Sequence, residues 1–147
     1  MKPINEMKLS FLSRSANESF ARAAVSAFIL QLDPTIGEMA DIKTAVSEAV
    51  TNCIVHAYAG TSGIIYITAQ IFEKGKVVIR VRDKGCGIAD IEQAMKPLFT
   101  TGGDERAGLG FAVMTSFTDK LKVTSAPQKG TTVTMTKFLS QDVQQNA

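Results

Sequence analysis

Three polar side chains share one face of a segment whose apolar spacing predicts a long helix. Glu48, Asn52 and His56 follow at intervals of four residues within 38–57, so a helix places them on one ridge beside its apolar stripe. Glu48 offers a carboxylate that could act as a general base. Asn52 offers a carboxamide oxygen of the hard kind that Mg²⁺ accepts beside phosphate oxygens and water. Polar residues on the flank of an amphipathic helix are often simply solvated, so this ridge alone leaves both interpretations open.

A second group of candidate residues follows a strand with an alternating pattern. The strand predicted over 76–82 continues its inward-facing alternation onto Asp83, so this carboxylate should point into the interior. A buried carboxylate needs a hydrogen-bond donor, and the amino group of an adenine could supply one. Gly85 and Gly87 permit a close approach that side chains would block, as a flat ligand beside the loop requires. The same residues could also form an ordinary turn after a strand.

Glycines also mark the start of a helix predicted over 108–118. Free backbone N–H groups and the positive end of the helix dipole at Gly108 and Gly110 would suit a polyphosphate, and Arg106 would add charge. Glycines in this pattern serve just as often as a plain helix start. The chain contains neither the dinucleotide fingerprint GxGxxG nor the phosphate loop GxxxxGK[ST], which excludes the two commonest nucleotide-binding signatures.

The elements around these groups must hold them in place. Alternation predicts a strand over 7–12, and a capping box of Ser15 and Glu18 predicts the start of a helix that ends at Asp33-Pro34. The other predicted elements are strands over 64–72, 76–82, 120–126 and 131–138, a short helix over 90–95, and tight turns at 73–75 and 127–130. This order predicts an α+β fold, a two-layer sandwich with helices on one face of a mixed, mostly antiparallel sheet.

Composition and charge favour one folded domain. The chain has 147 residues, 45% of them hydrophobic and 20% charged, which fits a single domain over 1–139 and a polar, frayed tail over 140–147. The formal charge is only +2 and no run of Lys or Arg forms a stripe, so direct binding of nucleic acid is not favoured.

Cysteine usage and hydropathy bear on the compartment. Cys53 and Cys86 lack CxxC spacing and the chain has a single histidine, so neither a zinc site nor a disulfide framework is indicated. The first residues do not resemble a signal peptide, and no segment approaches the roughly 18 apolar residues of a spanning helix. We therefore expect a cytoplasmic protein without a membrane partner.

In combination, the motifs resemble the ATP-binding superfamily of gyrase, Hsp90, histidine kinases and MutL. The segments similar in order and spacing to its N, G1 and G2 boxes and its closing threonine are Glu48-x-x-x-Asn52, Asp83-x-Gly85-x-Gly87, Gly108-x-Gly110 and Gly130-Thr131-Thr132. Within the superfamily, the chain resembles the small anti-sigma factor serine kinases of spore-forming bacteria, through the segments 18–22, 47–52, 97–101 and 108–111. The resemblance implies the Bergerat-type ATP-binding fold.

The resemblance also implies a role for each matching residue. Glu48 would act as base on an incoming serine hydroxyl, Asn52 would hold Mg²⁺, and Asp83 would bond the adenine amino group. Arg106, in a lid over 98–107 that is shorter and richer in glycine than usual, would lie near the γ-phosphate. The remaining nucleotide-binding positions that it implies are Gly85, Gly87, Thr100, Thr101, Gly108, Gly110, and Thr131 or Thr132.

The partners, too, are implied by the resemblance. Proteins of this kind use ATP or ADP with Mg²⁺, phosphorylate a serine of a small anti-anti-sigma protein, and as nucleotide-bound homodimers hold a sporulation sigma factor inactive. The helix over 17–31 would offer Arg22 for docking, although a solvated arginine is the commoner case. The alternatives are a general-stress anti-sigma serine kinase and a binding module without transfer activity, in which the nucleotide only changes the affinity for a partner. A histidine kinase would need an acceptor histidine on a helical hairpin. An ATP hydrolase would use Glu48 as the base that activates a water molecule.

Overall fold

The computed structural model describes residues 2–88 and 104–140, and for 104–109 it describes the backbone alone. The elements are β1 (Asn5–Leu12), α1 (Ala16–Ile29), α2 (Ile36–Asn52), a π-helical turn (Cys53–Ala57), β2 (Ile64–Ile71), β3 (Lys76–Asp83), α4 (Asp104–Phe117), β4 (Lys120–Ala126) and β5 (Gly130–Phe138). No helix in these two ranges is long and apolar enough to cross a membrane.

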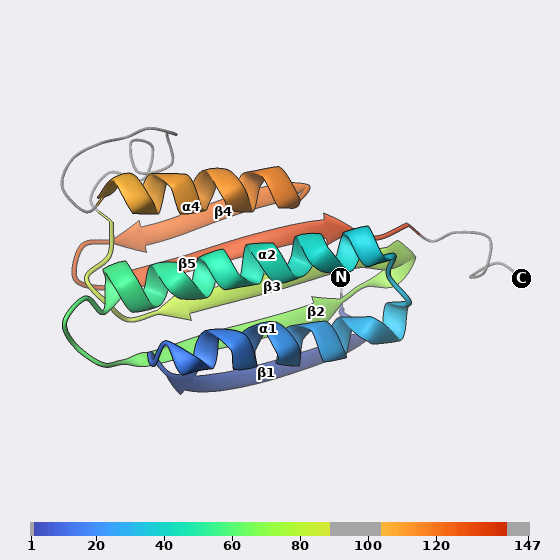
Figure 1. Ribbon diagram of the computed structural model, residues 1–147. Helices are drawn as coiled ribbons and strands as arrows, with labels where there is room; N and C mark the ends of the chain where they lie inside the picture. Colours follow the sequence, from blue (N-terminus) through green and yellow to red (C-terminus); the bar gives the residue numbers. More distant parts are fainter. Residues whose placement is uncertain (1, 89–103, 141–147) are drawn as a thin grey trace, which may run out of the picture.

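The strands form one sheet in the order β1-β2-β3-β5-β4, and helices α1, α2 and α4 cover one of its faces (Figure 1). This arrangement confirms the predicted α+β two-layer sandwich. All four strand pairs of the described sheet are antiparallel, so the parallel component of the predicted mixed sheet is not found there. Two pairs are hairpins, and the first of them turns at the predicted 73–75, where Lys74 and Gly75 have positive φ.

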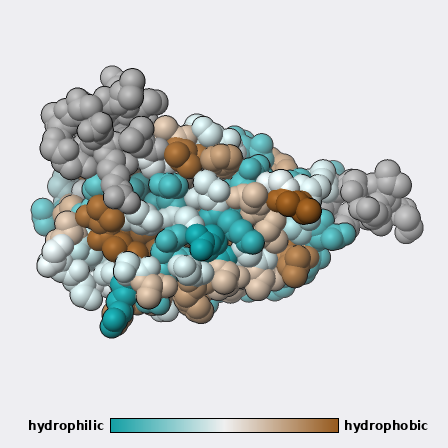
Figure 2. Space-filling model, viewed as in Figure 1, coloured by the Kyte–Doolittle hydropathy of each residue, from teal (hydrophilic) through white to brown (hydrophobic). Residues whose placement is uncertain are grey.

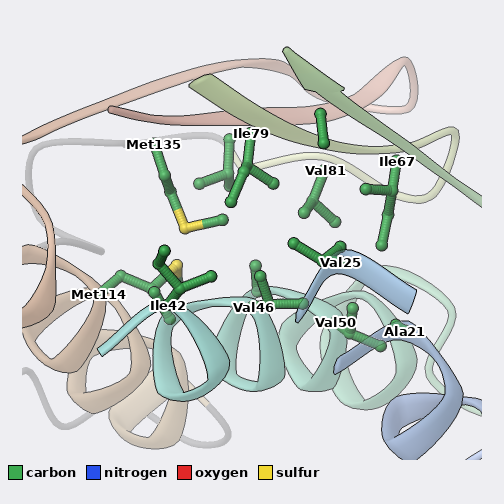
Figure 3. Packing of buried hydrophobic residues seen from close by; sticks show 14 of the residues in the cluster. Ala21, Val25, Ile42, Val46, Val50, Ile67, Ile79, Val81, Met114 and Met135 are labelled. Carbon is green, nitrogen blue, oxygen red and sulfur yellow. The ribbon is translucent and has the colours of Figure 1, made fainter. Parts of the chain in front are cut away.

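The core lies between the helices and the sheet (Figure 3). Ile42, Val46 and Val50 project from α2 and are almost fully buried, as the apolar stripe predicts. They meet sheet residues such as Ile79 and Val81 (Figure 3). Burial of each such side chain contributes about 1.5–3 kcal/mol, so the stripe fixes the rotation of α2 about its axis. The direction in which the flanking polar residues of α2 point is fixed with it.

The capping box lies at α2 and not at α1. Ser15 has helical backbone angles, and its side chain makes no capping hydrogen bond, so the capping box predicted there is wrong. A capping residue must be extended for its hydroxyl to reach back to the helix. Thr35 is extended: its hydroxyl accepts from the N–H of Glu38, and Glu38 accepts in return from the N–H of Thr35. Glu38 also accepts from the N–H of Ser140, which ties down the first residue of the predicted frayed tail.

The sheet face without helices, called the open face below, gathers basic side chains from distant parts of the sequence. Strand register places Lys8, Thr68, Arg80, Thr134 and Lys122 in one row across all five strands. Further cations of the open face are Lys76, Arg82, Lys84 and Lys120. Arg82 and Lys84 lie over the ring of Tyr66. The helix-bearing side differs, since its apolar residues are scattered among polar ones (Figure 2).

Candidate functional site

Asp83 ends β3 with its carboxylate in the interior, as the alternation of the strand predicts. Only 5% of the residue is exposed. Its Oδ1 accepts hydrogen bonds from the backbone N–H groups of Gly85 at 2.9 Å and Thr131 at 3.2 Å. Its Oδ2 accepts one from the thiol of Cys53 at 3.5 Å. The protein therefore supplies hydrogen-bond donors of its own to this carboxylate. The burial of Asp83 does not by itself require a ligand.

These hydrogen bonds do not fully offset the effect of burial on the pKa of Asp83. Desolvation raises the pKa of Asp83 above its ordinary value of 3.8, although the hydrogen bonds from Gly85, Cys53 and Thr131 oppose the rise. A carboxylate offers about four lone-pair sites, and three donors reach this one. One more donor, such as an exocyclic amino group, would favour the charged form.

The two glycines after Asp83 allow the chain to pack closely on itself. A Cβ atom on Gly85 would collide with the backbone carbonyl of Ala57 at the end of the π-helical turn. Gly87 has a φ of +77°, and a Cβ there would collide with the carbonyl of Ala126. Contact with protein backbone is thus sufficient reason for both glycines, and their predicted role toward a nucleotide stays a prediction.

Asn52 ends α2 in a confined position. The residue is half-buried, and its Nδ2 is buried without a hydrogen-bond partner among the described residues. Gly110 of α4 lies against it, since a Cβ at Gly110 would be 3.0 Å from Oδ1 and 3.2 Å from Nδ2 of Asn52. A buried polar group left without a partner costs about 1–3 kcal/mol, which marks this amide as a candidate for ligand contact. Glu48, one turn earlier, is also half-buried.

The predicted helix over 38–57 changes its hydrogen bonding directly after Asn52. Residues Cys53–Ala57 form a π-helical turn, which the N–H of Tyr58 closes onto the carbonyl of Cys53 at 3.0 Å. The Tyr58 hydroxyl donates to the carbonyl of Ile64 at 2.8 Å and accepts from the N–H of Lys84 at 2.7 Å. Such turns recur at functional sites. This one connects the end of α2 to the loop that follows β3, and half-buried His56 belongs to it.

Helix α4 begins at Asp104, four residues before the predicted start at Gly108. Gly108 and Gly110 therefore lie inside the helix, and the prediction that they supply free N–H groups at its beginning is wrong. Gly110 instead permits the close contact with α2. Arg106 belongs to the first turn of α4, but its side chain lies outside the described residues, as do Thr100, Thr101 and the helix predicted over 90–95.

Strand β5 separates the two candidate threonines. Thr131 is buried beside Asp83, and its hydroxyl lies 2.7 Å from that of Ser125. Successive residues of a strand point to opposite faces. Thr132 accordingly lies on the open face, where it lines a depression that includes Tyr66. Of the two alternatives, the structure brings only Thr131 to the site.

Arg22, the candidate for partner docking, connects two helices. Its Nη1 donates to Glu18 at 3.0 Å within α1 and to the hydroxyl of Ser47 on α2 at 3.2 Å. The guanidinium thus reaches the residue that precedes Glu48, and it is more than a solvated side chain.

Sequence reasoning missed two residues of this site. In the sequence, Cys53 stands out only for its lack of CxxC spacing, and Tyr58 belongs to no motif. A hydroxyl or thiol that bonds a residue distant in sequence leaves no periodic signal, so neither contact can be found from the sequence pattern alone.

Comparison with known proteins places this arrangement in a family. The histidine kinase-like ATPase domain family matches residues 11–137. A relative in Thermoanaerobacter sp. (strain X514), named "Anti-sigma F factor", is 60% identical over 143 residues, covering 97% of this chain and 99% of the relative. A relative of the same name in Halalkalibacterium halodurans is 54% identical over 138 residues, covering 92% and 94%.

Solved structures agree on the fold. The RsbU and RsbW domains of a Mycobacterium tuberculosis protein align with a TM-score of 0.67 at 20% identity, over 93% of this chain and 32% of that one. The histidine kinase domain of a blue-light activated kinase from Erythrobacter litoralis aligns with a TM-score of 0.56 at 20% identity, over 84% and 61%. The sequence matches, together with this shared fold, show that the chain belongs to the histidine kinase-like ATPase family and, within it, to the anti-sigma F factors.

Proposed function

We propose that this protein is a cytoplasmic protein-serine kinase and anti-sigma factor. It binds ATP or ADP with Mg²⁺, phosphorylates a serine of an anti-anti-sigma protein, and as a nucleotide-bound homodimer holds a sporulation sigma factor inactive. The observation that carries the enzymatic part is the buried amide of Asn52 against Gly110, one helical turn after a carboxylate.

The residues present fit a magnesium nucleotide. Asn52 would hold the metal through its carboxamide oxygen, a hard ligand of the kind that Mg²⁺ accepts beside phosphate oxygens. Asp83 has acceptor capacity left for the adenine amino group, and Thr131 supports Asp83 through its N–H. When bound, Mg-ATP supplies the phosphoryl group, and transfer depends mainly on positioning and electrostatics.

Glu48 distinguishes a kinase from a module that only binds. Its carboxylate would accept the proton of the serine hydroxyl as that oxygen attacks the γ-phosphorus, with ADP as the leaving group. Binding alone requires no base at this position. Arg106 would contribute positive charge near the γ-phosphate.

The names of the relatives support the regulatory part. Proteins 54–60% identical to this chain are named anti-sigma F factors, which supports a sporulation sigma factor as partner over a general-stress one. Arg22 would contribute to partner docking from the α1 surface, where it is held by Glu18 and Ser47. Neither nucleic acid nor membrane is proposed as a direct partner.

The test is transfer of labelled γ-phosphate from Mg-ATP to a serine of the cognate anti-anti-sigma protein. We expect Glu48→Gln to bind ATP as the parent does and to lose transfer about 10²–10⁴-fold, as loss of a general base does. Glu73→Gln is the matched control, because Glu73 lies in the exposed turn before β3, at the opposite end of that strand from Asp83. ATP binding without transfer by the parent would leave a nucleotide-switched binding module, and full transfer by Glu48→Gln would remove Glu48 as the base.

A further inference from the structure

The buried thiol of Cys53 contacts the carboxylate on which adenine recognition is proposed to depend. Cys53 is 4% exposed and is the first residue of the π-helical turn. Its Sγ lies 3.5 Å from Oδ2 of Asp83, and it is the only described residue that donates to this oxygen. Because the contact joins residues 30 positions apart, it fixes the turn after α2 to the end of β3.

The two carboxylate oxygens of Asp83 accept different numbers of hydrogen bonds from the described residues. Oδ1 accepts two backbone N–H groups, from Gly85 and Thr131, so both of its lone pairs are used. Oδ2 accepts only the thiol, so its second lone pair is the one left for a further donor. A ligand amino group and the Cys53 thiol would therefore share one oxygen atom.

The thiol acts here as a donor. The Sγ of Cys53 lies within hydrogen-bond distance of Oδ2 of Asp83, and an ionised carboxylate oxygen can only accept. The S–H group therefore points its positive end at the carboxylate.

Cys53 also follows Asn52 directly in the chain. One short stretch of backbone thus carries both the proposed metal ligand and the donor that reaches Asp83. A shift at either position is transmitted to the other through a single peptide unit.

We propose that Cys53 is a positioning residue of the nucleotide site, whose thiol holds Oδ2 of Asp83 in the orientation that receives the adenine amino group. The inference rests on the proposed function and adds to it a determinant of specificity for the 6-amino group. Cys53 acts through Asp83 and does not itself touch the nucleotide.

Two variants and two nucleotides test this inference. Cys53→Ala removes the donor, whereas Cys53→Ser restores one of similar size. Binding of ATP is compared with binding of purine riboside triphosphate, which lacks the 6-amino group, and Cys86→Ala is the control because Cys86 is the exposed thiol. We expect Cys53→Ala to weaken ATP about fivefold and to leave the purine analogue unchanged, with Cys53→Ser close to the parent.

The pH dependence supplies a readout that packing alone would not change. Loss of a donor to the charged form raises the pKa of Asp83 further, so the acid limb of ATP affinity should move to higher pH in Cys53→Ala and return in Cys53→Ser. Equal weakening of both nucleotides, or an unshifted acid limb, would overturn the positioning role. A parent that binds ATP and the purine analogue equally would instead overturn the assignment of Asp83 to adenine, and with it the proposed site.

Discussion

Replacing Gly110 by alanine should separate the stability of the fold from its binding of nucleotide. Gly110 lies inside α4, where alanine is favoured over glycine by about 1 kcal/mol. The new Cβ would lie 3.0 Å from Oδ1 and 3.2 Å from Nδ2 of Asn52, a few tenths of an ångström closer than ordinary contact. Because both helix backbones are packed into the core, the side chain of Asn52 is the part that must move.

The two effects have opposite signs. Crowding removes part of the helical gain, so we expect the free energy of unfolding to stay equal or to rise by up to about 1 kcal/mol, or about 2–4 °C in Tm. Displacing a group that positions a bound metal typically costs about tenfold or more in affinity, so, with Asn52 as the proposed ligand, binding of Mg-ATP should weaken by at least that factor. The more stable variant would thus be the poorer binder.

The assay pairs thermal unfolding with calorimetric titration of Mg-ATP. Gly37→Ala is the matched control, because Gly37 lies in the first turn of α2 and its added Cβ would meet only the Thr35 hydroxyl, at 4.0 Å. This control should gain stability and keep its affinity. Parent-like affinity in Gly110→Ala would refute the reasoning, and a loss of more than about 1 kcal/mol in stability would show that the helices separate instead.

Two further substitutions test contacts that hold the site in place. Tyr58→Phe removes two part-buried hydrogen bonds, each of which contributes about 0.5–1.5 kcal/mol, and should cost about 1–3 kcal/mol in urea unfolding. A change below about 0.5 kcal/mol would contradict the contact of the Tyr58 hydroxyl with Ile64 and Lys84. Thr35→Ala removes the cap of α2 and should cost about 1 kcal/mol near neutral pH. Burial alone would raise the pKa of Glu38, but hydrogen bonds from Thr35 and Ser140 outweigh it and lower the pKa below 4.5. Because a depressed carboxyl pKa stabilises the fold above the unfolded value, the difference between parent and Glu38→Ala, which removes the titrating carboxylate, should shrink as the pH falls below 4.5, and a constant difference would argue against the hydrogen bonds to that carboxylate.

Periodic patterns account for what could be predicted from the sequence. The alternation of β3 places Asp83 inward, and the stripe of α2 sets the direction of Glu48 and Asn52, because burial of apolar side chains dominates both choices. Each of these depends on residues close together in the chain. The local sequence is therefore sufficient to predict the directions of these side chains.

Features that depend on backbone angles or strand register could not be predicted. Ser15 and Thr35 both precede a glutamate by three residues, and only the extended backbone of Thr35 makes it a cap. The pairing of Asp83 with Thr131 across β3 and β5 decides which threonine reaches the site. The spacing of Gly108 and Gly110 predicts a helix start, whereas Gly110 lies inside α4 and contacts Asn52 of α2, which is distant in the sequence.

The distribution of charge over the two sides of the sheet has a consequence for encounter kinetics. On the described strands and at Lys84, which directly follows β3, the open face carries seven cations, and Glu6 is the one carboxylate of this face on those strands. The whole chain has a net charge of only +2, so the remainder is net negative. Such a separation exerts a torque on the molecule in the field of a charged partner, within about 8 Å at physiological salt. The protein would therefore rotate into a preferred orientation before contact, and ionic strength would change its association rate more than its dissociation rate.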